Sequence, residues 1–151
     1  ENNVFSNNNK QHFKNINPFL FTSYEGFKEL NRMINFNPLI DLAHLKVSAK
    51  SLSLDFNKQL TALLPLTDYI HLSDNNGLSD TNESFLEDAW FLKYLKSNLD
   101  YYSIEVYDES TNKIRQLINV VNQNLSKTKS IKYLSCRSSI ESLGYVKTTL
   151  Q

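Results

Sequence analysis

Short apolar segments alternate along the chain with longer stretches of helical periodicity. Four stretches carry apolar residues three or four positions apart, which is the spacing of an amphipathic helix. These stretches are 24–34, 52–64, 84–97 and 111–125. Three compact apolar runs between them indicate buried strands. These runs are 39–45, 68–73 and 101–107. A further strand is expected at the extreme N-terminus, around Val4 and Phe5.

Strands that alternate with helices at this spacing predict parallel βα units. Four such units over residues 1–127 would form half of a (β/α)8 barrel, or alternatively a small doubly wound sheet. Residues 128–151 fall outside this rhythm, and we expect them to form a C-terminal helix or arm. The other four units of a barrel are missing, so the chain is expected to be a fragment of a longer protein.

Composition places the chain among ordinary globular proteins. Of its 151 residues, 40% are hydrophobic and 21% are charged. The formal net charge is 0, which gives no electrostatic reason to expect nucleic acid or an anionic membrane as a partner. The single cysteine, Cys136, excludes an internal disulfide and favours the reducing cytoplasm. No apolar run approaches the roughly 20 residues that span a bilayer.

Residues that can bind metal occur on each of the four predicted strands or directly after them. They are Glu1, Asp41 with His44, His71 with Asp74 and Asp80, and Glu105. Ligands bind at the carboxyl ends of parallel strands, and buried carboxylates are costly unless they are paired or bound to metal. Singly, Asp41 could cap a strand end, the histidines could be core residues, and Asp80 could belong to a turn. Together these residues predict a site for one divalent cation.

Four segments carry a resemblance to a known family. They are Glu1-Asn2-Asn3, Pro38-Leu39-Ile40-Asp41-Leu42-Ala43-His44-Leu45, Tyr69-Ile70-His71-Leu72-Ser73-Asp74-Asn75-Asn76-Gly77, continuing to Asp80, and Tyr102-Ser103-Ile104-Glu105-Val106-Tyr107. They resemble the ends of the last four strands of xylose-isomerase-like TIM barrels, over roughly residues 1–125. The resemblance implies that this chain supplies about the last four βα units of a TIM barrel, followed by a C-terminal extension.

The resemblance also implies a function and the roles of individual residues. The implied activity is that of a divalent-metal-dependent sugar isomerase or epimerase, which moves a proton through an enediolate. The implied metal ligands are Glu1, Asp41, His71 and Glu105, with Glu1 and Glu105 as the catalytic acid/base pair. The implied substrate contacts are His44, Asp74, Asn75 and Asp80. Carboxylate and imidazole ligands suit Mn²⁺, Mg²⁺, Co²⁺ or Zn²⁺. A homo-oligomer and a sugar substrate are the implied partners.

Two other functions are compatible with the same pattern. The endonuclease IV branch of the family hydrolyses phosphodiesters with several zinc ions and carries Asp-x-His after its seventh strand. This chain has Asp80-Thr81-Asn82 there, and an amide is a poor replacement for an imidazole ligand. The other alternative is a non-catalytic interaction module, which the loss of half a barrel would favour and the retained set of ligand-type residues argues against.

Overall fold

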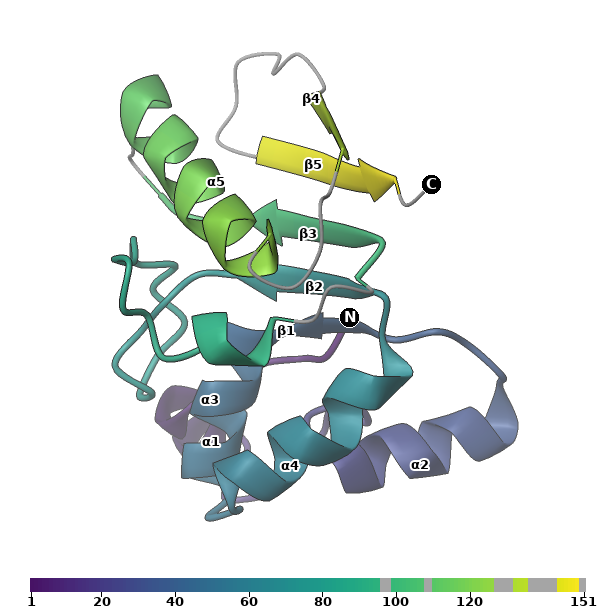
Figure 1. Ribbon diagram of the computed structural model, residues 1–151. Helices are drawn as coiled ribbons and strands as arrows, with labels where there is room; N and C mark the ends of the chain where they lie inside the picture. The colour runs from purple at the N-terminus through teal and green to yellow at the C-terminus, as the bar shows by residue number, and fades with distance from the viewer. Residues whose placement is uncertain (96–98, 108–109, 127–131, 136–143, 150–151) are drawn as a thin grey trace.

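A five-stranded mixed sheet organises the chain (Figure 1). The computed structural model describes residues 1–95, 99–107, 110–126, 132–135 and 144–149. The strands lie in the order β1-β2-β3-β5-β4. Their bounds are β1 Leu39–Asp41, β2 Tyr69–Leu72, β3 Tyr101–Ile104, β4 Lys132–Ser135 and β5 Gly144–Thr149. Strands β1, β2 and β3 are parallel, whereas β5 is antiparallel to β3 and β4 is antiparallel to β5.

The helices of the described residues pack beside this sheet. They are α1 Asn7–His12, α2 Tyr24–Met33, α3 Leu42–Ser51, α4 Phe56–Leu63 and α5 Thr111–Ser126, with the short 3-10 helices η1 Leu64–Leu66 and η2 Leu92–Tyr94. Helix α3 contacts α4 and β2, and α5 contacts β3. In Figure 1 the helices α1 to α4 lie below the β1 edge of the sheet. No helix in the described part of the chain is both long and apolar enough to cross a bilayer.

The predicted portion of a TIM barrel, with four parallel βα units, is wrong. Among the described residues the parallel part of the sheet has three strands, and the next position beside β3 is taken by the antiparallel strand β5. Residues 1–6 contain no strand, because the N–H and C=O of Asp41 at the edge of β1 bond to the side chain of Asn2 rather than to a neighbouring backbone. The segment 128–151 contributes β4 and β5.

The junction between β1 and α3 differs from its prediction. The apolar run 39–45 predicts one strand, but the strand ends at Asp41 and a helix begins at Leu42. The Asp41 carboxylate accepts a hydrogen bond from the backbone N–H of His44 at 2.7 Å and therefore caps the helix. Leu42 and Leu45 are as fully buried in the helix as they would be in a strand. A short apolar run does not distinguish these two elements.

The helix predicted at 84–97 is also wrong for the residues that the structure describes. Residues 84–95 contain turns and the single 3-10 turn η2. Side-chain contacts hold this segment in place of a helical ladder. The Phe85 and Phe91 rings pack edge to face at 4.9 Å, and the Trp90 indole donates a hydrogen bond to Asp74 at 2.9 Å. Side-chain packing and the hydrogen bond to Asp74 therefore override the local periodicity.

The helices predicted at 24–34 and 111–125 are confirmed as α2 and α5. Helix α2 follows the N-cap Ser23, whose hydroxyl accepts from the Gly26 N–H at 3.2 Å. Helix α5 buries Leu117, Val121 and Leu125, which recur every four residues along one side of the helix. Their burial explains why an amphipathic stripe of this length is a dependable signal of a helix.

The two faces of the parallel strands differ in chemistry. Alternate residues of β1, β2 and β3 enter the hydrophobic core; they are Ile40, Ile70, Leu72, Tyr102 and Ile104. The residues between them point to the other face. There Asp41, His71 and Ser103 are register partners on adjacent strands, and all of them are buried. The strands therefore turn their apolar side chains into the hydrophobic core on one face and place a row of polar groups on the other.

Candidate metal centre

The N-terminal segment brings Glu1 to the end of β1. The side chain of Asn2 is buried, donates to the Asp41 carbonyl at 3.0 Å and accepts from the Asp41 N–H at 2.6 Å. These two bonds replace the pairing that a neighbouring strand would provide. The Phe5 N–H donates to the Ser48 hydroxyl of α3 at 2.9 Å, which fixes the same segment further along. Glu1 is therefore positioned by its neighbours rather than by a strand.

Asp41 uses its two carboxylate oxygens differently. Oδ1 caps α3, whereas Oδ2 is buried and has no hydrogen-bond partner in the described part of the protein. Asp41 as a whole is 0% exposed. A buried carboxylate oxygen without a donor is energetically unfavourable, so its position calls for a cation.

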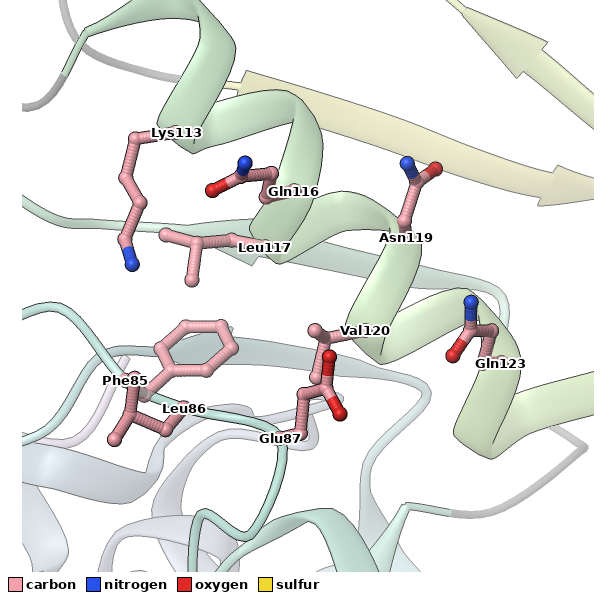
Figure 2. Close-up of a pocket in the computed structure, with 9 residues that line it drawn as sticks. All are labelled: Phe85, Leu86, Glu87, Lys113, Gln116, Leu117, Asn119, Val120 and Gln123. Atoms are coloured by element: carbon pink, nitrogen blue, oxygen red, sulfur yellow. The ribbon is translucent and has the colours of Figure 1, made fainter.

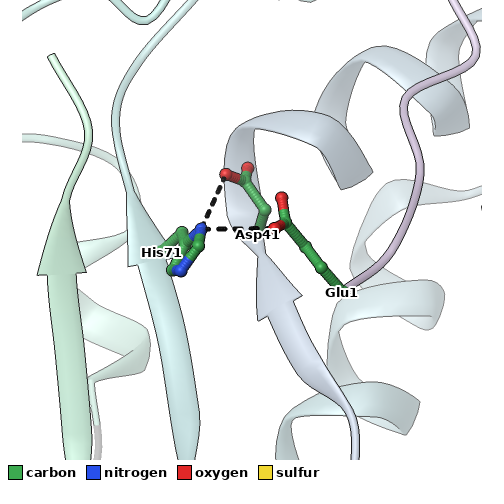
Figure 3. Close-up of side chains that lie close together, drawn as sticks. All are labelled: Glu1, Asp41 and His71. Carbon is green, nitrogen blue, oxygen red and sulfur yellow. Dashed lines mark ion pairs between the residues drawn. The ribbon is translucent and has the colours of Figure 1, made fainter.

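His71 of β2 directs its Nδ1 atom toward the same point (Figure 3). This nitrogen lies 3.8 Å from Asp41 Oδ2 and 3.7 Å from Glu1 Oε2. One ligand atom from each of Glu1, Asp41 and His71 lies within 4.8 Å of the others. We call these residues the metal triad. Bonds of about 2.1 Å to a tetrahedral metal place ligand atoms about 3.4 Å apart, close to the observed separations.

Glu105 reaches the metal triad from β3. Its backbone N–H donates to the Leu72 carbonyl at 3.0 Å, which continues the ladder between β2 and β3 beyond the end of the strand. Its Oε1 atom lies 2.9 Å from His71 Nδ1. Glu105 is not within the compact group formed by the triad itself. All four residues predicted as metal ligands therefore lie close together, and Glu105 contacts the metal triad through His71.

His44 connects two carboxylates beside the triad. Its Nδ1 lies 3.1 Å from Glu1 Oε1 and its Nε2 lies 3.1 Å from Asp80 Oδ2. Burial by itself lowers the pKa of His44, but the hydrogen bonds to Asp80 and Glu1 and the charge of Asp41 raise the pKa to about 11. His44 is therefore an imidazolium that donates both N–H groups, and it holds Glu1 in place instead of binding metal.

The carboxyl groups of the triad have opposite pKa shifts. The hydrogen bond from His44 lowers the pKa of Glu1, helped by the charge of His71 and opposed by burial. Burial raises the pKa of Asp41 to about 6, although both histidines favour its ionised form. A carboxyl group that is reluctant to ionise in the metal-free protein gains most from an adjacent divalent cation.

Asp74 and Asn75, which the resemblance assigns to the substrate, bond to other parts of the protein. Asp74 Oδ1 accepts from Lys46 Nζ at 2.8 Å and from Trp90 Nε1 at 2.9 Å. Burial raises the pKa of Asp74, but the Lys46 and Trp90 hydrogen bonds outweigh it, so the net shift is downward. Asn75 is buried and donates to the Ala43 carbonyl at 3.1 Å. Both residues hold the loop after β2 against α3, while Asp80 alone of that loop reaches His44.

Asn82 occupies the histidine position of the Asp-x-His pattern of the endonuclease IV branch. It is buried, and its amide oxygen accepts from the Ser73 hydroxyl at 3.0 Å. The side chain is thereby engaged within its own loop. Its surroundings are those of a structural residue and do not support several zinc ions.

Two residues of the site have no role in the sequence-based prediction. Asn2 holds Asp41, and periodicity contains no signal for such a contact between residues 39 positions apart. Ser103 is 0% exposed, its hydroxyl lacks a partner among the described residues, and it is the register partner of His71. Ser103 precedes Glu105 by two residues, so strand alternation alone could have placed the two side chains on one face.

The residues present fit a divalent cation. Two carboxylates and one imidazole converge, and Asp41 Oδ2 is buried without a hydrogen bond in the described structure. This donor set suits Mn²⁺, Mg²⁺, Co²⁺ or Zn²⁺, and Ca²⁺ less well because an imidazole is included.

A separate hollow of about 410 Å³ lies between residues 85–87 and α5 (Figure 2). Its wall includes Phe85, Leu117 and Val120, with Glu87 and Lys113 as its charged residues. None of the predicted site residues lines it. Its lining offers no convergent set of ligand atoms, so the metal triad remains the chemical centre of the described structure.

Comparison with protein-family models, with curated proteins and with solved structures found no match.

Proposed function

We propose that this protein binds a divalent metal ion through Glu1, Asp41 and His71 and acts as a sugar isomerase or epimerase. The observation that carries the proposal is the convergence of Asp41 Oδ2, which is buried and has no hydrogen-bond partner among the described residues, with His71 Nδ1 and the carboxylate of Glu1. The similarity of the surrounding segments to xylose-isomerase-like proteins supports the sugar chemistry.

A bound divalent cation would act as a Lewis acid toward a carbonyl and an adjacent hydroxyl group of the sugar. Glu1 and Glu105 approach His71 Nδ1 at 3.7 Å and 2.9 Å, so both carboxyl groups border the reaction volume. Glu1, kept ionised by His44, is suited to remove a proton from the carbon next to the carbonyl. Glu105, when protonated, would return a proton to carbon, and the carbon skeleton stays intact.

The proposed setting follows from composition. A single cysteine suits a reducing cytoplasm, and a net charge of 0 suits a small uncharged or weakly charged substrate better than a nucleic acid. We also propose a homo-oligomer, as the resemblance implies.

Proton exchange provides the decisive experiment. The full chain is loaded with Mn²⁺ and incubated in D₂O with a panel of free and phosphorylated ketoses, and deuterium on carbon is followed by mass spectrometry. We expect incorporation next to the carbonyl of at least one ketose. The Glu105→Gln variant should lose about 10²- to 10⁴-fold of this rate, because a proton-transfer group is removed.

Glu29→Gln is the matched control, because Glu29 is exposed on α2 and its replacement removes the same charge as Glu105→Gln. Its exchange rate should equal that of the native protein. Stoichiometric metal binding without deuterium incorporation into any ketose of the panel would sink the isomerase proposal and leave only a metal-binding protein.

A further inference from the structure

A pocket beside the metal triad bears on the substrate, and its interpretation rests on the function proposed above. The pocket has a volume of about 380 Å³ and is lined in part by Glu1 and His44. Because these two residues also belong to the metal centre, the pocket adjoins the metal triad on the side of Glu1 and His44. Its volume lies within the range of about 300–1,000 Å³ typical of small-molecule sites.

The charges at the pocket are already paired. His44 Nδ1 lies 3.1 Å from Glu1, and its Nε2 lies 3.1 Å from Asp80. His44 is therefore already engaged by two carboxylates, and no lysine or arginine is among the described residues that line the pocket. A phosphate group, with about −1.5 to −2 charges at neutral pH, would find no cationic side chain in this lining that is not already paired.

The remaining wall suits hydroxyl groups and C–H bonds. The exposed Asn3 carries both donors and an acceptor, which match the hydroxyl groups of a sugar. Asn9 is held in place by hydrogen bonds from Ser6 to its Oδ1 at 2.7 and 2.9 Å. The Phe19 ring is fixed by edge contacts with Phe5 at 6.3 Å and Phe13 at 5.9 Å. The carboxamides of Asn3 and Asn9 and the Phe19 ring therefore form an uncharged wall with both polar and apolar parts.

We propose that this pocket holds the uncharged, hydroxyl-bearing end of the substrate, so that the protein acts on free sugars rather than on sugar phosphates. The pairing of His44 with Glu1 and Asp80, and the lack of a lysine or arginine among the described lining residues, disfavour a phosphate. The Asn3, Asn9 and Phe19 side chains supply the contacts that a polyol needs.

Equilibrium dialysis with labelled sugars tests this directly. The Kd of the Mn²⁺-loaded full chain is measured for D-fructose, fructose 1-phosphate and fructose 6-phosphate. We expect D-fructose to bind with the lowest Kd. The Asn3→Lys variant introduces the missing counter-charge and should tighten the binding of at least one phosphorylated sugar about tenfold relative to D-fructose. Asn8→Lys is the control, because Asn8 is exposed on α1 outside the pocket and adds the same charge.

The possible results distinguish a failure of the pocket assignment from a failure of the proposed reaction. Tighter binding of a phosphorylated sugar by the native chain, an equal response of both lysine variants, or no saturable binding of any probe overturns the pocket assignment. Binding of D-fructose with the expected lysine response, but without deuterium exchange on any ketose, overturns the reaction alone. Exchange on phosphorylated ketoses in preference to free ones leaves the reaction standing and overturns the pocket.

Discussion

At the scale of single residues, the two oxygens of Asp41 explain how a helix cap becomes a candidate metal ligand. Oδ1 is committed to the His44 N–H, while Oδ2 is buried without a partner among the described groups. A helix N-terminus favours a negative charge, but the fully buried position raises the pKa of this carboxyl to about 6. The residue is therefore held in place for a structural reason and left available for a cation.

The Asp41→Asn variant separates the two roles. Asparagine caps helices as well as aspartate does, so the free energy of unfolding of the metal-free protein should change by less than about 1 kcal/mol. The affinity for Mn²⁺, measured by electron paramagnetic resonance, should fall at least about 100-fold because a charged ligand is lost. Asp55→Asn is the control, since Asp55 caps α4 through the Lys58 N–H and is not among the residues of the metal triad. An equal loss of affinity in both variants would contradict the assignment.

The raised pKa of Asp41 also predicts how metal binding depends on pH. Below about pH 6 this carboxyl is protonated in the metal-free protein, because burial raises its pKa, and a cation must displace the proton. We expect the Mn²⁺ affinity to fall about tenfold per pH unit below 6 and to level off above it. Titrations between pH 5 and pH 7.5 would check this. An affinity that does not change over that range would show that Asp41 is not a ligand.

At the scale of elements, a side chain takes the place of a strand at the edge of the parallel sheet. Asn2 satisfies the N–H and C=O of Asp41, and its own carbonyl lies 2.9 Å from His44 Nδ1. The edge is thereby closed to further pairing, and Glu1 is carried to the end of β1. The same contacts join the N-terminal segment, β1 and the first turn of α3 into one unit.

Removal of the Asn2 side chain should affect stability and metal binding together. In Asn2→Ala the buried N–H and C=O of Asp41 lose their partners, so the free energy of unfolding should fall by about 2 kcal/mol. Mn²⁺ affinity, measured at a temperature where the variant is folded, should fall by about tenfold because Asp41 and Glu1 are less well oriented. Asn3→Ala removes an exposed amide next to it and should change neither quantity. Loss of stability with unchanged affinity would restrict Asn2 to a structural role.

At the scale of the whole molecule, the sheet separates stability from chemistry. One face supplies Ile40, Ile70 and Ile104 to the core that α3, α4 and α5 cover, and the other carries the row of Asp41, His71 and Ser103. The triad joins the N-terminal segment, β1 and β2, which are distant in sequence. A cation bound there would crosslink these elements and so would stabilise the native chain as a whole.

Thermal unfolding should report this coupling. At a free Mn²⁺ concentration of about 100 times Kd, binding to the native state alone contributes about 2.7 kcal/mol. For a chain of this size we expect Tm to rise by about 5–10 °C and to return after chelation with EDTA. Asp41→Asn should show little of this rise. An equal rise in native and variant proteins would place the stabilising ion elsewhere.

The sequence by itself determined the local features. The stripes of α2 and α5 and the apolar core positions of β2 and β3 could be recognised from spacing and residue type. The choice of Glu1, Asp41, His71 and Glu105 as candidate ligands came from the resemblance of the surrounding segments. Periodicity is imposed by contacts within one element, so it is visible in a short window of sequence. The ends of the elements could be predicted less well from the sequence, as the early end of β1 and the capping of α3 by Asp41 show.

Only the tertiary structure decided which groups meet. It placed β5 antiparallel beside β3, used the Asn2 side chain to close the other edge of the parallel strands, and engaged Asp74 with Lys46 and Trp90. Each of these outcomes depends on contacts between residues far apart in the chain, whose free energies a local pattern does not encode. For the same reason the residue types predicted a candidate metal site, whereas only the fold showed which ligand atoms converge there.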